Sequence, residues 1–226
     1  MPLFGAVHLS LLAAILGAAF VLVWLCRQGK LAPRPVRLVL GYGIAVNELI
    51  WWVFRYSHEG IHWANLPLQL CDISVWASVL GCLTLIPALV EFVYFAGVAG
   101  AGMALLTPDL WRPWPSYPAI YFFLAHGGVV IAAIVLPFGK LGSVKKGAMW
   151  RSFGILALYA TGVGLFNALT GANYMYLRRK PSNPSLLDWL GPWPVYLVGA
   201  LVLALLFFWL LSIPLRAWAR MSSPEA

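Results

Sequence analysis

Residues 65–74 have the sequence Asn-Leu-Pro-Leu-Gln-Leu-Cys-Asp-Ile-Ser, and they mark the point where a surface loop becomes an apolar helix. Proline has a pre-set φ and no backbone N–H, so Pro67 suits the first turn of that helix, with Asn65 as the residue that caps it. This start places Cys71 about one turn inside the helix. Unpaired amide groups and the helix dipole favour a thiolate there, whereas the adjacent Asp72 opposes it.

Small, weakly polar side chains follow Cys71 at helical spacing. Ser74, Ser78 and Cys82 lie with it on one face of the expected helix. Such a stripe indicates a face that is turned towards other helices rather than towards lipid. An isolated cysteine within a membrane helix is most often a small packing residue, so packing and catalysis both stay open as interpretations of Cys71.

The composition is that of a polytopic membrane protein. Of the 226 residues, 62% are hydrophobic and only 10% are charged, so a soluble globule would leave too much apolar surface in water. The net charge of +8 resides in short loops between apolar runs, which favours lipid headgroups over nucleic acid as anionic neighbours. The first apolar run has no basic segment before it and no small-residue cleavage site, so we interpret it as a retained helix rather than a signal peptide.

Runs of about 20 apolar residues predict an all-α bundle of about seven transmembrane helices. These helices are expected at residues 7–26, 36–56, 67–85, 88–107, 118–138, 150–170 and 193–215. The third and fourth are separated only near Pro87 and should form a tight hairpin. No linker or repeat interrupts the sequence, so we expect one transmembrane domain over residues 1–226, with a flexible tail at residues 216–226.

The distribution of Lys and Arg predicts the orientation of the bundle. Alternate loops place ten of these residues on one side and five on the other, out of 15 in all. Because cytoplasmic loops carry the excess of positive charge, the N-terminus is expected outside and the C-terminus inside. The cluster of Arg178, Arg179 and Lys180 lies on the outer side and departs from this rule.

With this topology, polar residues from five helices and their flanking loops fall at one depth in the outer half of the bundle. They are His8, Asn47, Glu48, Gln69, Cys71, Asp72, His126, Asn167 and Asn173. Ionisable groups within a span are costly, so they usually face a partner or a wet cavity, and the layer is a candidate site. The alternative is that each residue satisfies a structural contact, such as a pair between Glu48 and Arg55.

Other features have ordinary structural interpretations. Glu91 is expected to be solvated near the cytoplasmic surface, and Ala96, Gly100 and Ala104 give the fourth span a face suited to close helix packing. Residues 178–194 are either a lid over the outer layer or an ordinary loop. Aromatic residues that flank the spans are expected to form interfacial belts, namely Trp111, Trp114, Tyr117, Tyr174, Tyr176, Trp189 and Trp193.

Motifs for cofactors and metals are absent from the sequence. No Walker loop, GxSxG elbow, HExxH motif or dinucleotide-binding fingerprint occurs. Cys26, Cys71 and Cys82 show neither CxxC spacing nor the Cys/His spacing of a zinc site. We therefore expect no cofactor, no metal and no disulfide framework.

Five motifs occur in order along the chain. They are Leu-Pro-Leu-Gln-Leu-Cys at 66–71, Leu-Thr-Pro-Asp-Leu at 106–110, Phe-Leu-Ala-His-Gly at 123–127, Gly-Ala-Asn-Tyr-Met-Tyr-Leu at 171–177 followed by Lys180-Pro181, and Leu-Asp-Trp-Leu-Gly-Pro-Trp-Pro at 187–194. Together they resemble the YwaF family of bacterial integral membrane proteins over nearly the whole chain. The resemblance implies a multi-pass protein of the bacterial plasma (inner) membrane.

That family is distantly similar to a eukaryotic membrane acyltransferase that remodels phospholipids through an acyl-cysteine. Carried over by motif, the resemblance implies Cys71 as the nucleophile and His126 as the histidine that assists it. The implied substrate is a phospholipid or lysophospholipid, whose acyl group passes to Cys71 and then to a lysolipid or to water. Acyl donor, acceptor and oligomeric state stay open at this point.

The remaining polar residues are candidates for supporting roles. Asn167 and Gln69 are candidate donors to the tetrahedral oxyanion, and Asp72 and Glu48 are candidates to orient the histidine. The rival interpretation is a non-enzymatic transporter, lipid-binding or scaffold protein whose pocket the same layer lines. The catalytic interpretation requires the Cys71 sulfur to lie within direct or one-water reach of an imidazole nitrogen.

Overall fold

Each apolar run of the sequence forms a helix in the computed structural model, which describes residues 1–110, 112–181 and 185–221. The first half contains α1 (Ala6–Arg27), α2 (Pro33–Glu59), α3 (Leu70–Thr84) and a continuous rod made of α4 (Pro87–Phe92), the π-helix η1 (Val93–Gly97) and α5 (Val98–Leu106). The second half contains α6 (Tyr117–Phe138), α7 (Ala148–Thr170), the 3₁₀ turns η2 (Tyr174–Tyr176) and η3 (Leu186–Leu190), and α8 (Val195–Met221). The described chain is all-helical, as predicted.

Six of these units are long and apolar enough to cross a membrane, counted over the residues that the structure describes. They are α1, α2, the α4–α5 rod, α6, α7 and α8. The third predicted span is different, because α3 has 15 residues and is shorter than a full crossing. The protein is thus an integral multi-pass membrane protein in which α3 reaches only part of the way through.

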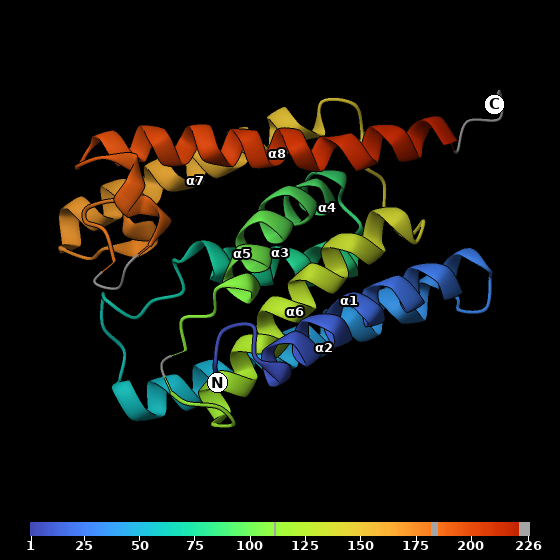
Figure 1. Ribbon diagram of the computed structural model, residues 1–226, viewed down its shortest axis with the longest axis horizontal. Coiled ribbons are helices and arrows are strands. Elements are labelled where there is room, and N and C mark those ends of the chain that lie inside the picture. The colour runs from blue at the N-terminus through green and yellow to red at the C-terminus, as the bar shows by residue number, and fades with distance from the viewer. Residues whose placement is uncertain (111, 182–184, 222–226) are drawn as a thin grey trace.

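The central helix is α6 (Figure 1). It packs against α1 and α2 and against α3 and the α4–α5 rod, while α7 packs on α4 and α8 lies beside α7. The predicted small-residue face includes Ala96, which is buried, and the neighbouring Gly97 approaches α6 closely, since a Cβ there would lie 2.9 Å from Val129. The π-turn over residues 93–97 adds a residue to the local helical turn and so changes which side chain faces α6.

The start of α3 differs from the prediction. The helix begins at Leu70 rather than at Pro67, and Gln69 instead of Asn65 is its N-cap. Asn65 belongs to the preceding loop, where its side chain bridges the backbone of residues 60 and 62. A capping box between Gln69 and Asp72 sets the boundary, because each side chain accepts from the other residue's backbone N–H, which has no partner within the helix.

Glu91 is buried and not solvated, contrary to the prediction. It is only 1% exposed, and its carboxylate accepts hydrogen bonds from Arg151 Nε at 2.8 Å and Nη2 at 2.7 Å and from the Lys145 backbone N–H at 2.9 Å. Because Glu91 lies in α4 and Arg151 in the first turn of α7, this ion pair fastens α7 to the bundle.

The C-terminal helix extends further than predicted. α8 continues to Met221, so the last turns of α8 occupy residues 216–221, where we expected the flexible tail to begin, and residues 222–226 lie outside the described residues. Trp111 of the expected aromatic belt and residues 182–184 of the 178–194 segment also lie outside them. Trp189 and Trp193 are exposed, as an interfacial belt requires, whereas Tyr174 is buried.

Candidate functional site

The N-terminus of α3 is held by a reciprocal cap. The Gln69 N–H donates to Asp72 Oδ2 at 2.9 Å, and the Gln69 side chain accepts from the Asp72 N–H. The N–H groups of Leu70 and Cys71 are then the first-turn amides without a partner among the described residues. Because these amides carry the positive end of the helix dipole, this end of α3 favours a negative charge.

Cys71 is the second residue of α3, closer to the helix end than we predicted. Its side chain is half-buried and forms no disulfide, and its thiol lies within electrostatic range of the carboxyl groups of Asp72 and Glu48. Ser74 and Cys82 of the same stripe are buried in the bundle, as predicted. Cys71 is therefore the more accessible cysteine of the stripe, at its loop end.

A short segment from the other end of the chain closes over this helix start. We call residues 174–177 the strap. The Met175 N–H donates to Gln69 Oε1 at 2.9 Å, which joins the strap to the cap of α3. The Tyr174 hydroxyl donates to the carbonyl of Trp63 at 2.7 Å and accepts from the Leu66 N–H at 2.6 Å. Burial raises the pKa of Tyr174, which keeps the hydroxyl protonated for this bond.

Asn167 and Asn173 shape the turn that carries the strap. Asn167 is fully buried at the end of α7, where its Oδ1 accepts from the Tyr174 N–H and its Nδ2 donates to the Tyr174 carbonyl, both at 2.9 Å. Asn173 Oδ1 accepts from the N–H groups of Arg178 and Arg179 at 3.1 Å. Both amide side chains thus hold the backbone around the strap.

The strap backbone is strained. Met175 and Tyr176 are consecutive residues with φ of 54°, in the left-handed region that costs a non-glycine residue about 1–2 kcal/mol. Besides Gln69, the hydroxyl of Tyr196 in α8 holds this conformation by donating to the Tyr176 carbonyl. Strain that persists under such restraint is found most often at functional sites.

Glu48 of α2 is a buried carboxyl group that neutral donors satisfy. It accepts from Trp52 Nε1 at 2.6 Å and from the Tyr121 hydroxyl at 2.8 Å, which ties α2 to α6. The pairing with Arg55 that the structural alternative offered does not form, because Arg55 Nε instead binds Glu59 at 3.0 Å. Glu48 therefore lies near Cys71 without a cationic partner among the described residues.

His126 lies in the middle of α6. Its Nδ1 is 2.8 Å from the carbonyl oxygen of Phe122, to which it donates, and its ring packs on the ring of the same residue at 4.2 Å between centroids. Among the described residues no hydrogen bond joins His126 to Cys71. The Nε2 atom is the ring nitrogen that remains for proton transfer, and the role of His126 as a base stays a prediction.

His8 and Asn47 lie apart from the cap of α3. His8 is fully buried, with Nδ1 accepting from the Phe4 N–H at 3.0 Å and Nε2 donating to the Leu105 carbonyl at 2.7 Å, so it joins α1 to the end of α5. Asn47 is half-buried in α2, and its Nδ2 has no partner among the described residues. The predicted layer therefore divides into a group around Cys71 and separate helix contacts.

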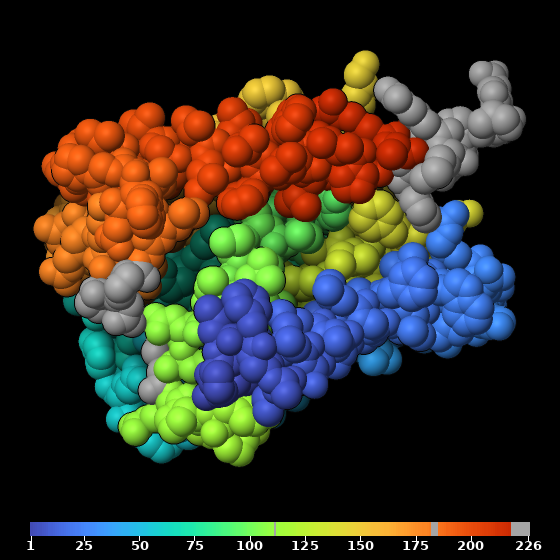
Figure 2. All heavy atoms as spheres, in the orientation of Figure 1, coloured from blue at the N-terminus to red at the C-terminus, as the bar shows by residue number. Residues whose placement is uncertain are grey.

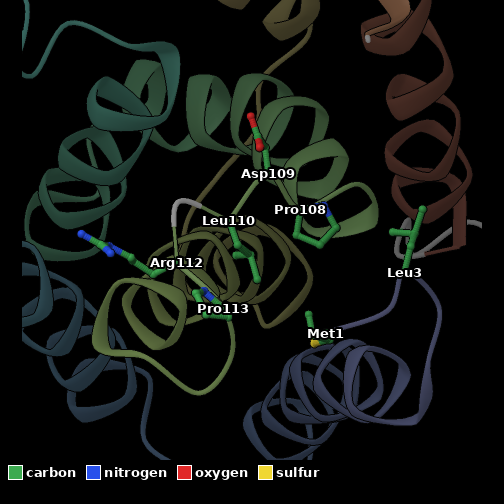
Figure 3. A pocket seen from close by; sticks show the side chains of 7 residues that line it. All are labelled: Met1, Leu3, Pro108, Asp109, Leu110, Arg112 and Pro113. Atoms are coloured by element: carbon green, nitrogen blue, oxygen red, sulfur yellow. The ribbon is translucent and has the colours of Figure 1, made fainter. Parts of the chain in front are cut away.

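A hollow elsewhere in the protein is lined by none of the candidate residues named above. It has a volume of about 440 Å³ and lies where the N-terminal segment meets the connection between α5 and α6 (Figure 3). The side chains of Asp109 and Arg112 point in different directions at its rim (Figure 3). Within the described residues, no three His, Cys, Asp or Glu side chains gather as a metal site.

Sequence reasoning missed the aromatic side chains that organise the site. Tyr121 holds Glu48, stacks on Trp51 at 4.2 Å between ring centroids and was not singled out. Tyr174 was interpreted as an interfacial residue, although its hydroxyl fastens the loop before α3. The available signal was its place in the motif at residues 171–177, beside two asparagines.

Comparison with known proteins gives one result. The model of a family described as the TMEM164 family matches residues 3–212, which is nearly the whole chain. No curated protein and no solved structure matches the chain.

Proposed function

This chain belongs to the TMEM164 family, and from that premise we propose that it is a membrane-embedded, lipase-like acyltransferase that acts on phospholipid esters through an acyl-thioester at Cys71. Within the family we place it with the bacterial YwaF-like proteins of the plasma membrane, with its N-terminus outside. The observation that carries the proposal is the position of Cys71 as the second residue of α3, where the backbone N–H groups of Leu70 and of Cys71 itself have no partner among the described residues.

The helix end bears on the two charges that the reaction creates. The dipole of α3 favours a thiolate at Cys71, whereas burial and the nearby carboxyl groups of Asp72 and Glu48 oppose it, so the thiolate forms only when a base takes its proton. The N–H groups of Leu70 and Cys71 are available as donors to the oxyanion of a tetrahedral intermediate. They take the role that the sequence offered to Asn167, whose side-chain amide binds the strap, and to Gln69, whose side-chain oxygen accepts from the N–H groups of Met175 and Asp72.

The proposed reaction has two halves. In the first, the Cys71 proton passes to His126 Nε2, directly or through water, and the thiolate attacks the ester carbonyl of a phospholipid. A C–S bond forms, the ester C–O bond breaks, and the imidazolium returns the proton to the departing lysophospholipid oxygen. In the second half, a lysolipid hydroxyl or water attacks the thioester, and its proton restores the Cys71 thiol.

The hydrogen bonds of the site also support a second candidate function, a non-enzymatic one. Among the described residues no hydrogen bond joins His126 to Cys71, and Gln69, Asp72 and Asn167 are engaged in caps and turns. This arrangement favours a non-enzymatic lipid-binding, transport or scaffold protein more than the sequence did.

Mass spectrometry separates the two functions. Purified protein incubated with a panel of phospholipids should gain the mass of one acyl chain, and hydroxylamine should remove it because it cleaves thioesters. Cys71→Ala should abolish the adduct, whereas Cys82→Ala, at a buried cysteine of the same helix, should keep it. Absence of a Cys71-dependent adduct with every lipid class would refute the acyltransferase.

A further inference from the structure

A small pocket lies directly beside the strap. It has a volume of about 120 Å³ and is lined by Gly171, Ala172, Arg178 and Arg179. Asn173 builds it, because its Oδ1 binds the N–H groups of both arginines and turns the chain back on itself. Gly171 has φ of 79°, and a Cβ there would lie 3.8 Å from Arg178 Nη1, so the absence of a side chain leaves room beside the guanidinium.

The two guanidinium groups carry charge that the protein does not neutralise. Arg178 Nη1 donates to the Asn167 carbonyl at 3.3 Å, and no carboxylate pairs with Arg178 or Arg179 over residues 1–110, 112–181 and 185–221. Their neighbour Lys180 does have an acidic partner, since its Nζ lies 3.8 Å from Asp188 Oδ1. Within the cluster at residues 178–180, the two side chains without a carboxylate partner among the described residues are therefore the two that line the pocket.

The charge of this pocket and its position at the end of α7 suit a phosphate group. The guanidinium fork matches two oxygens of a phosphate, and two adjacent forks balance its negative charge. The pocket adjoins Thr170, the last residue of the membrane-spanning α7, and headgroup phosphates lie at the ends of spans. A bound phosphate would also explain why Arg178, Arg179 and Lys180 lie on the expected outer side, although positive charge is normally enriched in cytoplasmic loops.

We infer that the pocket at Gly171, Arg178 and Arg179 binds the headgroup phosphate of a phospholipid and holds its ester near Cys71. The strap connects the two places: it lies between Ala172 and Arg178 in the chain, and the Met175 N–H of the strap donates a hydrogen bond to the side chain of Gln69, two residues before Cys71. Lipid reaches such a site from the membrane, and Figure 2 shows a hollow between α8 and α5 with α3 at its floor. The inference rests on the proposed function for its substrate.

Lipid binding tests the pocket without relying on catalysis. Detergent-purified protein is titrated with oleoyl lysophosphatidylcholine, with monoolein, which has the same chain and no phosphate, and with inorganic phosphate, and retained ligand is measured by native mass spectrometry. The wild-type protein should prefer the lysophospholipid. The double variant Arg178→Gln/Arg179→Gln should lose that preference by about tenfold or more, the factor expected for lost hydrogen bonds to a charged group.

A charge-matched control makes the test specific. Arg55→Gln/Arg112→Gln removes two positive charges from the same end of the bundle, outside the pocket, and should keep the phosphate preference. An equal loss in both double variants would reduce the effect to net charge and overturn the inference. So would an unchanged preference in Arg178→Gln/Arg179→Gln, or inorganic phosphate competing as well as the lysophospholipid, which would assign a soluble ligand instead.

The acyl adduct at Cys71 is measured in parallel on the wild-type protein. Phosphate preference without an adduct would refute the acyltransferase activity and support the phosphate-binding pocket. An adduct without phosphate preference would refute the phosphate-binding pocket and support the acyltransferase activity.

Discussion

Removing one hydroxyl group should open the site around Cys71. Tyr196→Phe keeps the buried aromatic ring at the start of α8 and removes only the hydrogen bond to the Tyr176 carbonyl. That bond restrains one of two consecutive residues in the left-handed region. We expect the strap to leave its position more often and the Cys71 thiol to react faster.

The magnitude follows from the single bond that is removed. A net contribution of about 1 kcal/mol for one hydrogen bond corresponds to a change of about fivefold in the opening equilibrium. The strain of about 1–2 kcal/mol at each left-handed residue favours opening and is already present in the wild-type protein. The variant therefore changes only the restraint, and labelling that requires opening should accelerate by the same fivefold factor.

The assay is site-resolved alkylation. Protein in detergent is treated with N-ethylmaleimide for a series of times, and labelled peptides that contain Cys71 and Cys82 are quantified by mass spectrometry. Tyr94→Phe is the matched control, because the Tyr94 hydroxyl is also buried and donates to an α8 carbonyl, that of Leu211 at 2.8 Å, far along the helix from the strap. Equal Cys71 rates in the two variants, or a parallel rise at Cys82, would show that the strap does not control access.

Three further outcomes are expected. Arg151→Met should lower the free energy of unfolding in mixed micelles, because it leaves the buried Glu91 carboxylate without its cation, and Glu91→Gln/Arg151→Met should recover part of the loss; an unchanged single variant would contradict this. Gly97→Leu should destabilise the bundle by about 1–3 kcal/mol in the same assay, since its Cβ would meet Val129 at 2.9 Å, and wild-type stability would mean that α6 moves aside freely. In intact cells, a membrane-impermeant maleimide added outside should label Cys71 if the N-terminus is outside, and labelling only in inverted vesicles would reverse the topology.

Local sequence signals were reliable for the existence of helices and less reliable for where they begin. Pro67 is a good first-turn residue, yet α3 begins at Leu70 because Gln69 and Asp72 satisfy each other's amides. The helical repeat also predicted which small side chains share one face of α3, and Ser74, Ser78 and Cys82 on that face are buried as predicted. Such features depend on neighbours within a turn or two, which the sequence displays directly.

The candidate site was predictable only in part. Gln69, Cys71 and Asp72 are close in sequence, so their common location followed from the motif that contains them. The strap contacts them across 106 residues, through the bond between Met175 and Gln69, and no local pattern announces a contact of that range. The pair suggested between Glu48 and Arg55 was wrong for the same reason. Arg55 is the nearest cation in the sequence, but Glu48 binds Tyr121 from another helix, and Arg55 binds Glu59.

The sequence by itself determined that this is an integral membrane protein and where its apolar helices lie, because each crossing of a bilayer requires about 20 apolar residues. The tertiary structure alone decided that α3 is short, that Glu91 is buried against Arg151, and that a strained strap covers the helix start at Cys71. The reason is physical. Hydrogen-bond partners far apart in the chain are chosen by which helix faces pack together, and that choice depends on the whole bundle at once.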